Sequence, residues 1–370
     1  MKKKIWIFLI LLVFISVAFL AAAKFFGSVT YYSPKPEENN INSAPPIQAA
    51  PIIPPLNTAL YDQKLEELAN NPIPKPIIPK KDKEGNIIEE PPPPVKPNLW
   101  PVKTAYPDAG AILPFSRIVA YYGNFYSTKM GILGEYPEDQ VLARLQAQVQ
   151  EWQAADPSTP VIPAIHYIAV VAQGSPGKSG KYRARMPDSE IQKAIDMAAK
   201  INALVFLDVQ VGCSDVQTEV PLLEKYLKLP NVHLGIDPEF SMKGCIPPGR
   251  VIGTLDASDI NFVSDYLSGL VKEYNLNPKI LIIHRFTENM VTNYKEIKTS
   301  PEVQIVMNMD GWGDAAHKKQ TYNSFIYKEP VQFTGFKIFF KNDILTPGTS
   351  IMSPQDLLKL RPIPVYIQYQ

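Results

Sequence analysis

Two carboxylates, Asp237 and Glu239, follow the largely apolar run VHLGI at residues 232–236, and their residue types suit acid–base chemistry. In an extended chain, residues two positions apart point to the same face and lie within about 7 Å of each other. Two carboxyl groups that close in a partly dry site cannot both ionise freely, so the more buried one keeps its proton near neutral pH. Such a pair can protonate a leaving oxygen and support an oxocarbenium-like transition state, which is the chemistry of glycosidic bond cleavage.

Polar residues also follow the other apolar runs of the sequence, and their convergence on one pocket would be informative because buried charges are costly unless paired. Asp208 is predicted to support the acid pair as a further catalytic carboxylate. A salt-linked network with Arg285 and Lys337 as cationic partners is the alternative for any single residue. The predicted substrate-contacting residues are Tyr121, Tyr122, His166, Gln210, His284, Arg285, Asn308, Asp310 and Trp312.

The elements that must position these residues are eight short β-rich runs that alternate with helical patterns. Continuous apolar strands that alternate with helices favour a parallel sheet, and eight repeats in about 250 residues favour closure into a (β/α)₈ barrel. An open doubly wound sheet is the alternative. The predicted strands lie within residues 117–123, 161–170, 203–211, 232–240, 279–286, 303–311, 333–340 and 364–370.

Helices are expected between these strands because apolar residues recur there at helical spacing. In residues 257–275, for example, Val263, Leu267, Leu270 and Tyr274 share one face, and Asp188 or Ser189 is expected to cap the helix of residues 186–202. The predicted helices lie within residues 137–153, 186–202, 219–229, 257–275, 287–297, 315–327 and 353–360.

Aromatic residues are expected near the carboxyl ends of the strands as well. Trp312 lies in the stretch MDGWGD, where flanking glycines allow a loop to present the ring. Flat rings stack on sugar faces, so Trp312 and the tyrosines are predicted to contact a sugar. Packing at the barrel rim is the alternative for the tyrosines.

The two cysteines of the chain are predicted to form a disulfide. Cys213 follows the third predicted strand and Cys245 the fourth, so a barrel places them in neighbouring loops. A location outside the cytoplasm permits the bridge, and two free thiols are the alternative.

The first 27 residues are predicted to target the chain to a membrane. Lysines at positions 2–4 precede residues 5–23, an uncharged apolar run long enough to cross a bilayer as a helix. The positive end should stay in the cytoplasm, which places the rest of the chain outside. We expect an uncleaved anchor, with a cleaved signal peptide as the alternative because Ala21 and Ala23 suit a signal peptidase.

Residues 28–110 are predicted to form a proline-rich extracytoplasmic linker that leads to a barrel domain of residues 111–370. Of the chain's 37 prolines, 17 lie between Pro34 and Pro101. Proline lacks an amide donor and fixes φ, so such a stretch extends as a stalk. One brief helix is expected within residues 58–71, with Thr58 as its cap.

Two fragments resemble chitinase-like family 18 glycoside hydrolases, which are (β/α)₈ barrels: IVAYYGNF at residues 118–125 and GIDPEF at residues 235–240. The fourth strand of that family reads DxxDxDxE, in which the last Glu is the general acid and the Asp two before it orients the substrate's acetamido group. The resemblance implies that Glu239 is the acid and Asp237 the orienting residue. Val232 and Gly235 stand where the family has its first two acids, so the resemblance supports a sugar-cleaving barrel broadly.

Together these features predict an extracytoplasmic, membrane-tethered glycoside hydrolase-like barrel that acts on cell-envelope or extracellular polysaccharide without a cofactor or metal. A barrel that binds glycan or peptidoglycan without turnover is one alternative. A metal-dependent hydrolase is another, because the histidines and carboxylates of the predicted pocket are all metal-ligand types. The net charge of +1 gives no electrostatic argument for a nucleic-acid partner.

Overall fold

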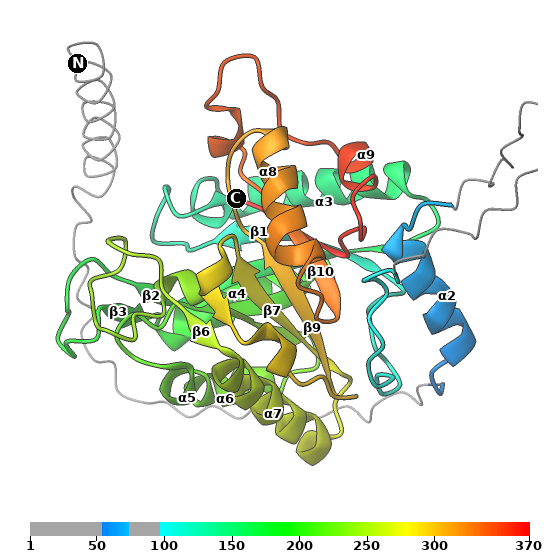
Figure 1. Cartoon of the computed structure of the whole chain (residues 1–370). Helices are drawn as coiled ribbons and strands as arrows, with labels where there is room; N and C mark the ends of the chain where they lie inside the picture. The colour runs from blue at the N-terminus through cyan, green and yellow to red at the C-terminus, as the bar shows by residue number, and fades with distance from the viewer. Residues whose placement is uncertain (1–53, 74–96) are drawn as a thin grey trace, which may run out of the picture. The chain divides into compact units, whose positions relative to one another are not determined.

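Eight parallel strands form a closed barrel in the computed structural model, which describes residues 54–73 and 97–370 (Figure 1). The strands follow one another around the barrel in chain order, and the last pairs with the first, with Tyr366 opposite Ile118. The eight predicted strands are confirmed, and the open sheet is excluded. They are β1 (Arg117–Gly123), β2 (Val161–Ala172), β4 (Leu204–Val209), β5 (Val232–Ile236), β7 (Lys279–Arg285), β9 (Val303–Met309), β10 (Phe333–Ile338) and β11 (Tyr366–Tyr369).

Three short strands lie outside this ring. β3 (Arg183–Arg185) pairs antiparallel with the end of β2. β6 (Leu255–Asp256) pairs with β8 (Val291–Thr292) in a separate two-stranded sheet. The carboxyl ends of the eight ring strands form the mouth of the barrel, and their amino ends form its lower end.

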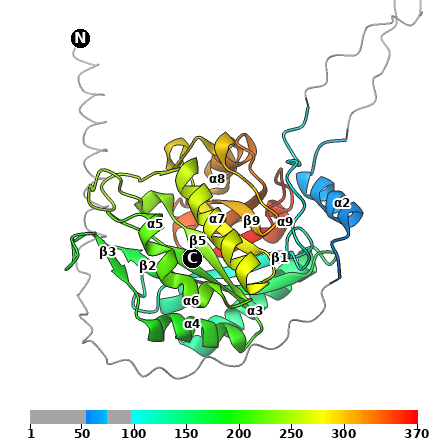
Figure 2. The same ribbon diagram turned by 90° about the horizontal axis from the view of Figure 1, so that it is seen from below.

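The helices that follow the strands lie around the outside of the barrel (Figure 2). The α-helices are α2 (Thr58–Ala69), α3 (Glu138–Ala155), α4 (Asp188–Ala199), α5 (Val216–Glu219), α6 (Glu224–Leu227), α7 (Ala257–Tyr274), α8 (Ala315–Tyr322) and α9 (Pro354–Leu357). Shorter 3₁₀ turns are η1 (Ile132–Gly134), η2 (Pro221–Leu223), η3 (Pro238–Phe240), η4 (Glu288–Met290), η5 (Tyr294–Glu296) and η7 (Asn342–Ile344), and a π-helical turn, η6 (Asn323–Tyr327), follows α8.

Several helix predictions need correction. Residues 287–297 form two 3₁₀ turns and β8 in place of an α-helix, because the Arg285 guanidinium binds the carbonyl oxygens of Thr287, Glu288 and Val291. Residues 219–229 are broken at Pro221, which lacks the amide donor that a continuous helix needs.

The predicted helix caps were also partly wrong. Asn57, rather than Thr58, caps α2 by accepting a 3.0 Å hydrogen bond from the Leu60 amide. Pro187 stands at the start of α4 without a side-chain cap. In α7, Val263, Leu267 and Leu270 are buried as expected, but Tyr274 is exposed near the last turn.

Apolar side chains fill the barrel at its lower end and separately line the space between strands and helices. The interior cluster comprises Ile118, Ala120, Ala164, Phe206, Ile280, Ile282, Val306, Phe333, Val365 and Tyr366, with Leu113 and Tyr61. Gln304 at the start of β9 hydrogen-bonds to the backbone of Leu113 in both directions. Because Tyr61 belongs to α2, this helix covers the lower end of the barrel.

The predicted disulfide is confirmed, since Cys213 and Cys245 are bonded to each other. The bridge joins the loop after β4 to the loop after β5 at the mouth.

Within residues 54–73 and 97–370, none of the helices has the length and apolar composition to cross a membrane. The predicted membrane segment of residues 1–27 lies outside the described residues, as does most of the predicted linker. The division of the chain at residues 27 and 110 stays a prediction.

Candidate functional site

Side chains that point into the barrel change from apolar to polar towards the mouth. Residues two positions apart on a strand share a face. Tyr122 therefore points into the barrel interior as Ala120 does in β1, and His284 as Ile282 does in β7. The polar layer formed in this way comprises Tyr122, His166, Asp208, His284, Asn308, Lys337 and Gln368, all of which are buried.

Asp208 lies at the centre of this layer and is fully buried. Its Oδ2 accepts a 2.9 Å hydrogen bond from the Tyr122 hydroxyl. Its Oδ1 lies 3.4 Å from Nε2 of His166 and 3.4 Å from Nε2 of His284. Burial opposes the charge on Asp208, but the two imidazoles outweigh burial and hold its pKa well below the usual range. Asp208 is therefore ionised.

His284 connects Asp208 to a second carboxylate, Asp310. Nδ1 of His284 lies 2.9 Å from Asp310 Oδ2, and Asp310 Oδ1 lies 2.9 Å from the Lys337 ammonium. Burial opposes the charge on His284, but Asp208 and Asp310 outweigh it and raise its pKa to about 10. These residues thus form a buried salt-linked network, with Lys337 as the cation that the sequence suggested.

His166 stays neutral in this layer. Burial lowers its pKa to about 4 against the opposing effect of Asp208. Its Nδ1 lies 2.5 Å from the Tyr366 hydroxyl and 3.1 Å from Nε2 of Gln368. Two residues of β11 therefore hold Nδ1 of His166 in place. His166, Asp208 and His284 also form the group of metal-ligand side chains that lies close together among the described residues, with ligand atoms within 4.8 Å of one another.

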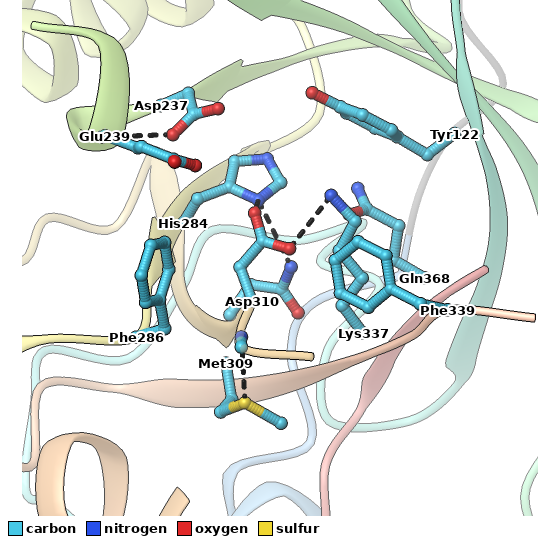
Figure 3. A network of polar contacts seen from close by, with 12 residues as sticks. Tyr122, Asp237, Glu239, His284, Phe286, Met309, Asp310, Lys337, Phe339 and Gln368 are labelled. Atoms are coloured by element: carbon cyan, nitrogen blue, oxygen red, sulfur yellow. Dashed lines mark hydrogen bonds and ion pairs between the residues drawn. The ribbon is translucent and has the colours of Figure 1, made fainter. Parts of the chain in front are cut away.

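The carboxylates of Asp237 and Glu239 do not share a strand face, because β5 ends at Ile236. Asp237 instead caps η3, where its Oδ1 accepts a 3.1 Å hydrogen bond from the Glu239 amide. Pro238 starts this turn, since its fixed φ and missing amide end the strand pairing. The prediction of a shared face was wrong, but the turn still brings both carboxyl groups to the same side of His284 (Figure 3).

Both carboxyl groups titrate above their usual range. Burial raises the pKa of Asp237 to about 7. Burial and the neighbouring Asp237 and Asp310 charges raise the pKa of Glu239 to about 8. Near neutral pH the pair therefore holds a proton that it can donate.

Gln210 links the carboxylate pair to the polar layer. Its Nε2 lies 3.2 Å from Asp237 Oδ2 and 3.3 Å from the Tyr122 hydroxyl. Its Oε1 accepts a 3.1 Å hydrogen bond from the Ala172 amide, which holds the side chain in place. Asp237 is thus connected through Gln210 and Tyr122 to Asp208.

Two predicted substrate contacts, Tyr121 and Arg285, point out of the barrel. Tyr121 packs edge-on against the rings of Phe340 and Tyr369 in the outer apolar layer. Arg285 is fully buried, donates to four backbone carbonyls and pairs with Glu329 at 2.6 Å. Both predictions were wrong. Tyr122 in β1 and His284 in β7 face the interior, so their neighbours in sequence, Tyr121 and Arg285, face outwards.

The remaining predicted residues, Asn308 and Trp312, lie in or near the polar layer. Asn308 is buried, with its Nδ2 3.5 Å from Nδ1 of His284. Trp312 follows β9 and is 55% exposed, so its ring is presented to solvent as the flanking glycines suggested.

Phe286 and Phe339 were not predicted as site residues, although they follow β7 and β10 and flank the network in Figure 3. Lys337 lies 4.9 Å from the centroid of the Phe339 ring and 3.9 Å from that of Tyr122. An aromatic residue just beyond a strand end was the signal that would have identified both phenylalanines.

Comparisons with known proteins assign the chain to no family. No family model matches it, and no curated protein matches its sequence. Among solved structures, it is similar to the xyloglucan-specific endo-β-1,4-glucanase XEG5A, a family 5 glycoside hydrolase from a metagenomic library, with 11% identity and a TM-score of 0.32 over 66% of this chain and 80% of that one. It is also similar to dihydropteroate synthase from Burkholderia cenocepacia, with 10% identity and a TM-score of 0.32 over 70% and 86%. Similarity at this level is uninformative about activity.

Proposed function

We propose that this chain is a membrane-tethered, extracytoplasmic glycoside hydrolase-like barrel that acts on a cell-envelope or extracellular polysaccharide. The carboxylate pair Asp237 and Glu239 carries the proposal, because both groups stand together at the mouth with raised pKa values. Their resemblance to the last two acids of the family 18 motif supports the same assignment.

Glu239 is the proposed general acid. Its pKa of about 8 keeps the carboxyl protonated at neutral pH, and its partial exposure lets a substrate reach it. As the glycosidic bond breaks, the proton passes from Glu239 to the leaving oxygen, and a water molecule then adds to the anomeric carbon and returns a proton to Glu239. Asp237 is the orienting or stabilising carboxylate, and the hydrogen bonds from Gln210 and the Glu239 amide fix its position.

Asp208 and Asp310 act as supporting carboxylates in this proposal, because they hold His284 between them below the acid pair. Trp312, which is exposed, and Phe286, which is half-buried, provide flat rings near the mouth on which a sugar can stack. The apolar segment of residues 5–23 and the proline-rich residues that follow it are the proposed anchor and spacer.

Turnover of β-linked and N-acetylated glycans by the purified full chain tests the proposal. Glu239→Gln is expected to lower kcat by about a hundredfold or more with the fold retained, because the variant cannot donate the proton. Glu288→Gln is the matched control: this exposed carboxylate also follows a strand at the mouth, and its loss should leave kcat unchanged.

Equal activity of the wild type and Glu239→Gln would refute the mechanism. Glycan binding without any turnover would instead support a binding barrel. Cell fractionation tests the location, which recovery of the full chain from the cytosol alone would contradict.

A further inference from the structure

Three buried polar atoms of the barrel interior point at one another without a hydrogen-bond partner among the described residues: His166 Nε2, Asp208 Oδ1 and His284 Nε2. All three side chains are completely buried. Buried polar groups are nearly always satisfied in folded proteins, so three unsatisfied atoms at one place require a physical reason.

The distances between these atoms are longer than those of direct charge-assisted hydrogen bonds. Each imidazole Nε2 lies 3.4 Å from Asp208 Oδ1, whereas charge-assisted N–H···O bonds measure about 2.7–2.9 Å. Two ligand atoms that are each about 2.1 Å from a tetrahedral zinc ion stand about 3.4 Å apart. Both distances therefore fit ligands that share an ion. The two imidazole nitrogens lie within 4.8 Å of each other and must stand no more than about 4.2 Å apart when both bind the ion.

Each of the three ligand groups is also fixed from behind. His284 Nδ1 lies 2.9 Å from the Asp310 carboxylate, and His166 Nδ1 lies 2.5 Å from the Tyr366 hydroxyl. The second carboxylate oxygen of Asp208 accepts the hydrogen bond of Tyr122. Metal-binding histidines typically donate the N–H of their second nitrogen to an outer acceptor, which sets the tautomer and the ring orientation. The acceptor for His284 is Asp310, and the acceptor available to His166 is the Tyr366 hydroxyl.

Gly235 on β5 leaves the space beside these atoms open. A Cβ at this position would lie 2.5 Å from Asp208 Oδ1 and 2.6 Å from His166 Nε2. Any other residue would therefore displace two of the three ligand atoms.

We propose that His166 Nε2, Asp208 Oδ1 and His284 Nε2 bind one divalent transition metal ion of the zinc class inside the barrel, and that His284 releases its Nε2 proton to solvent when the ion binds. Two imidazoles and one carboxylate suit zinc or cobalt, whereas calcium and magnesium prefer sites built from oxygen alone. Three protein ligands leave a four-coordinate ion one position for water or a substrate oxygen. The site does not require that the barrel cleaves glycosides, and its test is separate from that of Glu239.

The experiment measures metal binding by the purified full chain. After removal of bound metal with a chelator, Co²⁺ is titrated into the protein while its visible absorption and thermal unfolding are followed. We expect saturation at one Co²⁺ per chain, the absorption of a tetrahedral nitrogen–oxygen site, competition by Zn²⁺ and a higher melting temperature. Absence of saturable binding by the wild type overturns the proposal, whatever the variants do.

Variants locate the ion. His166→Gln and His284→Gln should each weaken Co²⁺ binding by about a hundredfold or more, because each removes a ligand. Asp310→Asn should weaken it by about 10- to 100-fold through His284. Gly235→Ala keeps all three ligands but fills the space, so loss of binding in this variant supports the geometry.

The two other histidines of the chain are the controls. His317 is exposed on α8, and His233 is buried on β5. His317→Gln and His233→Gln should bind Co²⁺ as the wild type does, and a loss of binding in His317→Gln equal to that in His166→Gln would contradict the site. Glu239→Gln should retain the ion, so failure of the metal site and failure of the proposed catalysis are distinguishable.

Discussion

The ammonium group of Lys337 lies 2.9 Å from Oδ1 of Asp310, and both side chains are buried. Removing the cation would take away one of the two cationic partners of the buried Asp310 carboxylate and leave His284 as the other. Lys337→Met is therefore expected to lower the free energy of unfolding by about 3 kcal/mol. Urea unfolding of the full chain measures this change.

Lys341→Met is the control for that prediction. Lys341 pairs with Glu135 at 2.7 Å, but its side chain is 68% exposed, so its removal should cost less than about 1 kcal/mol. Equal losses in the two variants would show that the Lys337 pair is no more important than a surface ion pair.

Glu239 should make folding stability depend on pH. Its pKa is about 8 in the folded protein against 4.5 for an ordinary Glu, so between these values the unfolded state loses its proton first. Stability should therefore fall as the pH rises through this window, by on the order of 2 kcal/mol for a carboxyl that solvent partly screens. Asp237, with a pKa of about 7, adds to the loss in the same direction.

Urea unfolding at several pH values tests this dependence. Glu239→Gln has no proton to lose and should show a smaller decline between about pH 5 and pH 8. Glu288→Gln should keep the wild-type slope. A pH dependence of Glu239→Gln equal to that of the wild type would contradict the raised pKa.

The disulfide should stabilise the loops at the mouth. Cys213 and Cys245 are separated by 32 residues in sequence, and closing a loop of that length restricts the unfolded chain. The double variant Cys213→Ser/Cys245→Ser is expected to lose about 3–4 kcal/mol of stability. Thermal unfolding with and without reductant measures the effect, and reductant should shift only the wild type.

Arg285 should matter for stability and not for sugar recognition. Its guanidinium binds four backbone carbonyls and Glu329, so Arg285→Met leaves several buried acceptors unsatisfied. We expect a loss of about 3 kcal/mol or more and an unchanged KM for any glycan that the folded variant turns over. A raised KM with unchanged stability would restore Arg285 to the site.

The barrel itself was predictable from the sequence, because eight apolar strands alternate with helical segments and this number of repeats favours a closed barrel over an open sheet. The orientation of individual side chains was not. In β1 and β7 both faces are buried, so no alternation of polar and apolar residues indicates whether Tyr121 or Tyr122, and His284 or Arg285, points inwards. Only the register of the closed ring decides it.

The acid pair shows a different limit. The spacing of Asp237 and Glu239 correctly indicated that the two carboxyl groups lie near each other, but it could not show that the strand stops at Ile236. Pro238 was the available signal, since proline at that position favours a turn. The contacts of the Arg285 guanidinium with the carbonyl groups of Thr287, Glu288 and Val291 likewise cannot be inferred from helical spacing.

Helix α2 has a practical consequence for anyone who expresses this domain. It buries Tyr61 against the interior cluster, and the Leu68 carbonyl accepts a hydrogen bond from Ile363 just before β11. A fragment cut at residue 111 would present the open lower end, with Leu113, Ile118 and Phe333, to water. We expect that fragment to aggregate, whereas one that starts ahead of Asn57 should remain monodisperse in solution.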